Sequence, residues 1–184
     1  MYGSFDVRRK VFLSFYQKDR SEVDRFINQF SDVFIPKAIG VSYNEDLINS
    51  TDPEYVMTQI RKKYLGDSSV TIVMIGSCTH SRRYVDWEIK SSLRQGSYTP
   101  NGLIGILLPS TGTSAYLPPR LYENWNEDLK DCYARYHSYP TSASVLRSWI
   151  EDAYSARTSR SEFLKNSSNM MKYNSKCNVH NVTH

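Results

Sequence analysis

The stretch Ser69-Val-Thr-Ile-Val-Met-Ile-Gly76 decides the fold class, because it is a short, β-branched and almost wholly apolar run. Two further runs have the same character, Lys10-Val-Phe-Leu-Ser-Phe-Tyr16 and Gly102-Leu-Ile-Gly-Ile-Leu-Leu-Pro109. Near-continuous apolarity over so few residues is typical of strands that are covered on both faces, as in a parallel sheet. Weaker strand candidates lie at 38–43 and near 133–136.

Helical patterns alternate with these strands. Ser21-Glu-Val-Asp24 has the pattern of a capping box, and Thr51-Asp52-Pro53-Glu54 that of a helix start with proline in the first turn. A third helix is expected over 82–95, with Gly96 as its C-cap, and an amphipathic helix over 141–157. The alternation predicts an α/β fold: an open parallel sheet of about five strands with helices on both faces.

The chain is long enough for one domain and short for two, since it has 184 residues. We therefore assign residues 1–157 to a single domain. From residue 158 the sequence turns to Ser, Asn, Lys and Arg with little periodicity. Composition predicts that 158–184 form a polar tail, which is mobile or depends on a partner for its order.

Charge and cysteine content exclude several classes of function. A net charge of +4 without a basic stripe is far from a nucleic-acid-binding signature. The three cysteines include no CxxC pair and the histidines show no metal-ligand spacing, so neither a disulfide framework nor a metal site is predicted. No apolar run reaches membrane-spanning length and no leader is visible at the start of the sequence, so the expected location is the cytoplasm.

In a sheet of this kind, ligands bind outside the carboxyl ends of the strands. The loops at 16–20, 43–52, 76–82 and 109–116 are therefore expected to form the site. Two familiar sites of this architecture are absent: the first loop has no glycine for a flavin phosphate, and the third strand ends in Ile75-Gly-Ser77 rather than a phospho-acceptor aspartate. GxGxxG and GxSxG motifs are absent as well.

Two segments carry a resemblance to a known family. They are Val11-Phe-Leu-Ser-Phe-Tyr-Gln-Lys-Asp19 and Gly76-Ser-Cys-Thr-His-Ser-Arg-Arg-Tyr-Val-Asp-Trp-Glu-Ile-Lys90. Together they resemble the TIR superfamily, and more narrowly the TIR-like domain of Thoeris antiphage proteins of the ThsB type. The second segment is similar to that family's pattern of two serines, an aromatic residue and a glutamate, here Ser77, Ser81, Tyr84 and Glu88. Patches at 117–124 and around Trp149-Ile-Glu-Asp152 extend it, and the family differs in having Trp-Cys where this chain has Tyr84-Val85.

The resemblance implies a single TIR/flavodoxin-like domain that cleaves NAD at the nicotinamide–ribose bond. In the Thoeris type, the ADP-ribose product cyclises into a signal that a separate effector protein reads. NAD is thus the implied substrate and no other cofactor is expected. Self-association on activation is also implied, because TIR enzymes often complete their pocket by assembly. The family's catalytic glutamate corresponds to Glu88.

Elementary chemistry supports a carboxylate in that role. Departure of nicotinamide builds positive charge on the ribose C1′ and ring oxygen, as in glycoside cleavage, and a fixed carboxylate beside the ribose stabilises that cation. Glu88 lies off the apolar stripe formed by Val85, Ile89 and Leu93 and has no basic residue three or four positions away. Asp86 has Lys90 at i+4, so it is predicted to form an ordinary surface pair worth ~0.3 kcal/mol. The residues alone leave Glu88 equally open to a surface role; the resemblance favours function.

Other candidate substrate-binding residues surround this position. Phe15 and Tyr16 can stack on a base, or can be ordinary core and rim residues. Ser14 and Ser77 can bond ribose or phosphate, or can cap local turns. A pyrophosphate could be held by an arginine, and of the adjacent Arg82 and Arg83 we assign Arg83 to the site, with Tyr84 beside it. Trp87 is expected to pack against a neighbouring helix or subunit.

Three functions follow from these observations. The first is an NAD-cleaving enzyme that makes a cyclic ADP-ribose-type signal. The second is a non-catalytic TIR-like interaction module that assembles through its helical and aromatic surfaces. The third is a base-exchange or deoxyribosyl-transfer enzyme, which would turn over nucleosides but not NAD.

Overall fold

The computed structural model describes residues 7–39, 50 and 52–183 and contains a five-stranded sheet. The strands are β1 (Arg9–Phe15), β2 (Phe34–Ile39), β3 (Val70–Ile75), β4 (Gly102–Leu107) and β5 (Arg135–His137). Their order across the sheet is β2-β1-β3-β4-β5, and all four neighbouring pairs are parallel. The predicted α/β class and open parallel sheet are confirmed.

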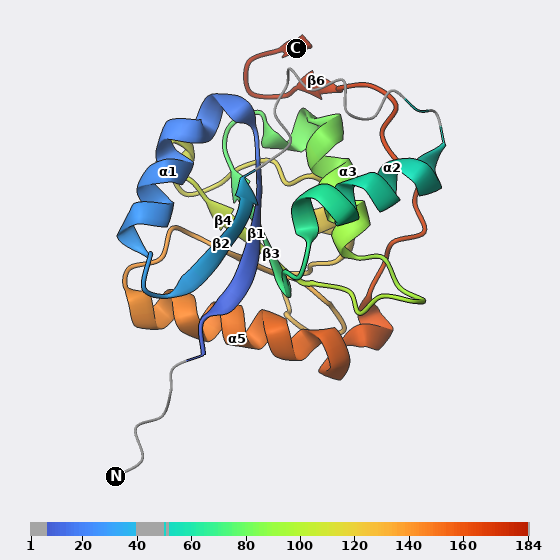
Figure 1. The fold of residues 1–184 in the computed structure, drawn as a ribbon. Helices are drawn as coiled ribbons and strands as arrows, with labels where there is room; N and C mark the ends of the chain where they lie inside the picture. Colours follow the sequence, from blue (N-terminus) through green and yellow to red (C-terminus); the bar gives the residue numbers. More distant parts are fainter. Residues whose placement is uncertain (1–6, 40–49, 51, 184) are drawn as a thin grey trace.

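Helices cover both faces of this sheet (Figure 1). On one face α1 (Arg20–Gln29) and α5 (Ala143–Ser159) pack against alternate residues of β1 such as Val11 and Leu13. On the other face lie α2 (Pro53–Ile60), α3 (Arg83–Ser92) and the short α4 (Pro119–Glu123). Phe12 faces α2 and α3 because side chains alternate along a strand, and Ser14 is directed to the same face.

Several elements begin and end where the sequence predicts. Asp52 is the N-cap of α2, accepting a hydrogen bond from the Glu54 amide at 3.0 Å, and Pro53 occupies the first helical position. The helix continues through one π-helical turn at Arg61–Leu65. In α3 the stripe of Val85, Ile89 and Leu93 is fully buried against the sheet. The Ser142 hydroxyl caps α5 by accepting from the Val145 amide at 3.3 Å.

Three boundaries differ from the predictions. Strand β2 begins at Phe34, four residues before the predicted 38–43, because Phe34 pairs in register with Arg9. The capping box at Ser21 is not formed: a 3₁₀ turn at Gln17–Asp19 runs directly into α1, so Ser21 lies inside the helix. Gly96 has φ of 88° but is not the C-cap of α3, since the helix ends at Ser92.

After α5 and a 3₁₀ turn at Ser161–Phe163, the chain runs back along α3 and ends in the hairpin of β6 (Lys176–Cys177) and β7 (Val182–Thr183) (Figure 1). We call residues 161–183 the strap. The Met171 carbonyl accepts from Trp87 Nε1 at 2.7 Å, and the Ser81 carbonyl accepts from the Ser175 amide at 3.0 Å. Composition does not reveal this packing, because the strap makes many of these contacts through its own backbone groups, which every sequence carries.

Candidate functional site

Glu88 lies on the second turn of α3, against the carboxyl end of β1. Its side chain is buried, with 1% of the residue exposed, and its Oε2 accepts a hydrogen bond from the Ser14 hydroxyl at 2.5 Å. Ser14 is fully buried, one residue before β1 ends. The structure thus places the predicted catalytic carboxylate beside the first predicted binding residue, at the sheet edge where this architecture binds ligands.

Aromatic and basic side chains form a small pocket over Glu88. Its lining residues come from the end of β1 and from the first turns of α3; they are Phe15, Tyr16, Gln17, Arg82, Tyr84, Val85 and Glu88. The space open to the centre of a water molecule is only about 10 Å³, which is room for about one water. A dinucleotide therefore cannot enter the pocket in this closed arrangement.

Arg82 and Tyr16 close the pocket together. The Arg82 guanidinium lies 4.0 Å from the centroid of the Tyr16 ring, a cation–π contact, and Arg82 Nε donates to the Cys78 carbonyl at 3.4 Å. Both side chains are buried, with 3% and 6% exposed. Such contacts are worth about 2 kcal/mol or more when desolvated, so the closed arrangement is held by an interaction that the binding of a nucleotide can replace.

The predicted binding residues divide into two groups. Ser14, Phe15, Tyr16 and Tyr84 meet Glu88 at the pocket. Arg83 does not: its guanidinium packs outside, over the Trp87 ring at 5.3 Å, and donates to the Lys172 carbonyl of the strap at 3.3 Å.

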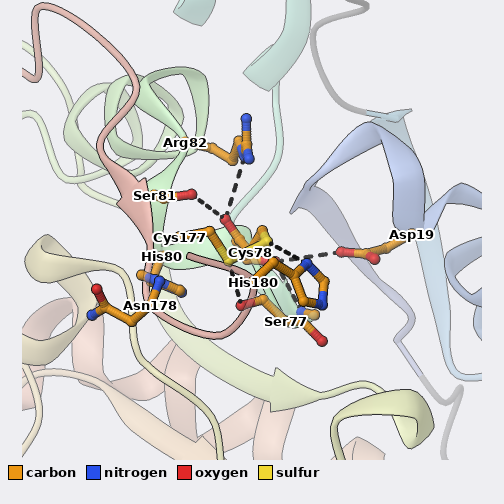
Figure 2. Close-up of a disulfide and its surroundings, with 11 residues drawn as sticks. Asp19, Ser77, Cys78, His80, Ser81, Arg82, Cys177, Asn178 and His180 are labelled. Carbon is orange, nitrogen blue, oxygen red and sulfur yellow. Dashed lines mark hydrogen bonds between the residues drawn. A yellow bond between two sulfur atoms is a disulfide. The ribbon is translucent and has the colours of Figure 1, made fainter. Parts of the chain in front are cut away.

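Ser77 is also outside the pocket lining, half-buried beside the Cys78–Cys177 disulfide (Figure 2). The loop at 43–52, including Asn44-Glu45-Asp46, lies mostly outside the described residues.

Asp86 corrects the sequence interpretation of the same helix. It is 3% exposed and forms a buried ion pair with Arg120 of α4, with Nε and Oδ1 3.0 Å apart. Its Oδ2 also accepts from the Met171 amide at 2.9 Å. Lys90 does not pair with it but donates to the strap carbonyls of Asn166 and Ser168. The predicted surface pair was wrong, because the partners come from positions far away in the chain.

A second carboxylate, Asp19, lies at the same sheet edge. It is in the turn after β1 and accepts from the Thr79 hydroxyl at 3.5 Å. Burial, followed by the nearby charge of Glu22, raises the pKa of Asp19 to about 6. A Cβ on Gly76, directly after β3, would collide with this carboxylate, so a larger residue there would displace the Asp19 side chain. Neither role is visible in the sequence.

Cys78 and Cys177 form a disulfide between the loop after β3 and strand β6, with Cα atoms 5.3 Å apart (Figure 2). The expectation of no disulfide was therefore wrong. The two cysteines are 99 residues apart in sequence, and only the return of the strap to α3 brings them together. Cys132 is the free cysteine and is buried.

Sequence reasoning also missed Gln17 and Val85 as lining residues, and it assigned Arg83 where Arg82 lines the pocket. Arg82 is the extended N-cap residue of α3, with φ of –97° and ψ of 117°. A residue in that position precedes the first helical turn, so its side chain can turn toward the strand edge. Whether α3 begins at Arg82 or at Arg83 determines which of the two side chains reaches the pocket. Helix boundaries predicted from sequence are uncertain by more than one residue.

The fold and the carboxylate at the sheet edge define a TIR-like α/β domain. Residues 12–113 match the family described as Thoeris protein ThsB, TIR-like domain, and the chain belongs to that family. The match includes β1 from Phe12 onward, β3 and α3, with Ser14 and Glu88, and ends before the strap. Membership supports a role in antiphage defence.

No curated protein matches the sequence. Within the described ranges, no helix has both the length and the apolarity that crossing a lipid bilayer requires.

Proposed function

We propose that this domain cleaves NAD at the nicotinamide–ribose bond and converts the ADP-ribose part into a cyclic signalling nucleotide that a separate defence effector reads. The observation that carries the proposal is the buried Glu88 carboxylate at the carboxyl edge of the sheet, hydrogen-bonded to Ser14. Membership of a TIR-like family supports NAD as the substrate, and the aromatic walls of the pocket suit a nucleotide base.

In the proposed reaction the C1′–N bond breaks and its electron pair leaves with nicotinamide as a neutral base. The positive charge that remains on C1′ and the ring oxygen is stabilised by the Glu88 carboxylate. A nucleophilic group of the ADP-ribose part, a ring nitrogen of the adenine or a ribose hydroxyl, then attacks C1′ to close the cycle, and one proton is released. Water attack at the same carbon gives linear ADP-ribose instead.

Ser14 is a positioning residue in this account. Its hydroxyl donates to Glu88 Oε2, which fixes the carboxylate rotamer in a site from which water is largely excluded. Hydrogen bonds to charged groups contribute about 1.5–3 kcal/mol. The second oxygen, Oε1, is then oriented independently of the substrate, so the carboxylate need not reorganise as charge develops on the ribose.

Substrate entry requires the pocket to open. We propose that Arg82 and Tyr16 separate when the domain is activated, by self-association or by a signal of infection. Opening frees the guanidinium of Arg82 for the pyrophosphate and the Tyr16 ring for a base. The small volume of the closed pocket predicts that the resting domain turns over NAD slowly.

Product analysis tests the proposal. Concentrated protein is incubated with NAD, alone and with extract from infected cells, and nicotinamide and nucleotide products are separated and weighed by liquid chromatography and mass spectrometry. We expect nicotinamide together with a nucleotide of the mass of cyclised ADP-ribose, and neither from Glu88→Gln. Glu127→Gln is the matched control, because Glu127 is exposed. Turnover that persists in Glu88→Gln contradicts the assignment.

The non-catalytic interaction module is the second candidate. This interpretation is supported if millimolar NAD fails to raise the melting temperature of the wild-type domain, in the presence and absence of the infected-cell extract. Cleavage of nucleosides without cleavage of NAD would instead indicate the base-exchange or deoxyribosyl-transfer reaction.

A further inference from the structure

Three potential metal ligands meet where the strap reaches the loop after β3 (Figure 2). They are the Sγ atoms of Cys78 and Cys177 and a ring nitrogen of His180, and these atoms lie within 4.8 Å of one another. We call this group the cysteine corner. Both cysteines are buried and His180 is exposed. Among the described residues, no other group of three or more His, Cys, Asp or Glu side chains brings its ligand atoms this close together.

The turn between β6 and β7 presents two of these ligands from one short segment. Cys177 is the last residue of β6 and His180 follows three positions later. The turn is closed by the Asn181 amide, which donates to the Cys177 carbonyl at 2.8 Å, while Asn181 adopts φ of 58°. Cys-x-x-His is therefore folded here as a chelating turn, and its spacing differs from the CxxC and HExxH patterns.

A further histidine supports the turn. His80 Nε2 accepts a hydrogen bond from the Asn178 backbone amide at 3.1 Å, and His80 is 7% exposed. Asn178 lies between the two ligands of the turn, so this bond holds the Cys177–His180 segment in place from the side of the loop that carries Cys78. Groups that orient metal ligands in this way commonly change metal affinity by about 10–100-fold when removed.

We infer that the reduced cysteine corner is a binding site for one thiolate-preferring divalent cation of the zinc class, held by Cys78, Cys177 and His180. Zinc binds thiolate sulfur at about 2.3 Å and imidazole nitrogen at about 2.0–2.1 Å in tetrahedral geometry, which separates the two ligand atoms by about 3.5 Å. Cys78 Sγ and His180 Nδ1 are 3.3 Å apart. The fourth position is open for water or another ligand.

The disulfide and the metal are alternative occupants of the corner. In the disulfide each sulfur is bonded to the other, so neither can be a thiolate ligand. Two molecules of a small thiol reduce it, forming their own disulfide and leaving the two protein thiols. Binding the cation then releases two protons as both thiols become thiolates. In either form Cys177 stays linked to Cys78; in the reduced, metal-free form this link is absent and hydrogen bonds such as that from Trp87 to Met171 hold the strap.

Cobalt(II) is the probe that tests this inference, because its visible and near-ultraviolet spectrum reports tetrahedral geometry and thiolate ligation. Protein reduced with a phosphine, freed of the reductant under anaerobic conditions, is titrated with Co²⁺ and then with Zn²⁺. We expect one Co²⁺ per chain with a thiolate charge-transfer band, displacement by one Zn²⁺, and no such band in the disulfide form. Reduced wild-type protein that develops no thiolate band overturns the inference.

Variants test which residues bind the metal. Cys177→Ser removes one of the two thiolates, so the charge-transfer band of a two-thiolate site is expected to be lost. His180→Ala is expected to weaken Co²⁺ binding at least tenfold while leaving the disulfide able to form. Cys132→Ser and His137→Gln are matched controls, since neither residue belongs to the corner, and both should bind Co²⁺ as the wild type does. Unchanged affinity in His180→Ala contradicts the three-ligand site. None of these readouts depends on NAD cleavage.

Discussion

The two sides of α3 carry buried carboxylates that are only two residues apart, yet their surroundings differ. On the side of α4 and the strap, Asp86 is enclosed by Arg120 and the Met171 amide, which together satisfy both of its oxygens. On the side of β1, Glu88 meets the Ser14 hydroxyl beside a small pocket with aromatic walls. Asp86 is paired with the guanidinium of Arg120, whereas Glu88 borders the pocket in which we propose that positive charge develops on the substrate.

We infer from this difference that Asp86 stabilises the fold and that Glu88 takes part in the proposed reaction. A buried carboxylate that is already paired contributes to the architecture, and removing one partner of such a pair is costly. A buried carboxylate that borders a pocket retains part of its electrostatic potential for a molecule that binds once the pocket has opened. We therefore predict that the free energy of unfolding depends on Asp86 and that NAD turnover depends on Glu88.

The largest expected effect on stability is that of Asp86→Asn. Arg120 is 2% exposed, so the variant leaves a buried guanidinium without its counter-ion. We expect a loss of about 3 kcal/mol in the free energy of unfolding, at the lower end of the range for breaking a buried pair. Urea denaturation measures it. The matched control is Asp152→Asn, whose pair with Arg160 is partly exposed and should cost under about 1 kcal/mol. Equal losses of unfolding free energy in the two variants would contradict the distinction between the buried and the partly exposed pair.

Ser14→Ala tests the proposed role of Glu88 in NAD cleavage. The variant removes the hydrogen bond to Glu88 Oε2, and we expect NAD turnover to fall at least about tenfold, because a bond to a charged group is worth roughly 1.5 kcal/mol or more. Ser91→Ala is the control: Ser91 is also fully buried, but its hydroxyl bonds the Trp87 carbonyl within α3. A matching loss in Ser91→Ala would show that the effect is one of packing.

The smallest expected effect concerns Asp19, the second carboxylate at the carboxyl edge of the sheet. Because its pKa is raised to about 6, the folded protein binds more protons than the unfolded chain between about pH 4 and pH 6, and stability falls as the pH rises through that window. Asp19→Asn should therefore stabilise the domain at pH 7.5, by about 1 kcal/mol after allowance for solvent screening. The gain should be lost by pH 4.

Melting temperatures at the two pH values measure this gain, with Asp24→Asn as a control for loss of a nearby surface charge. A gain of equal size at both pH values would contradict the linkage to Asp19.

Much of the fold follows from local sequence patterns. The apolar runs that became β1, β3 and β4 and the Asp52-Pro53 start of α2 are local features, so periodicity and capping residues predict them. Glu88 is predicted from the resemblance of its segment to the TIR family, because the residues alone leave its role open. Its burial was not predicted, because the neighbouring face of the sheet is unknown until β1 and β3 are paired.

The failures share one physical cause. Asp86 pairs with a residue 34 positions away, and Cys78 bonds to one 99 positions away. Both contacts depend on where α4 and the strap pack against α3, which no local pattern in the sequence specifies. The early assignment of Arg83 failed differently: a one-residue shift in the helix start exchanges it with Arg82.

The most direct test of the account measures Glu88→Gln and Asp86→Asn side by side, for NAD turnover per folded molecule and for free energy of unfolding. We predict that Glu88→Gln loses at least about 100-fold in turnover while its stability changes by under about 1 kcal/mol, because the amide can still accept from Ser14. Asp86→Asn should show the opposite pattern, less stable but still active where it is folded. Turnover retained in Glu88→Gln, with the fold intact, would contradict the central claim.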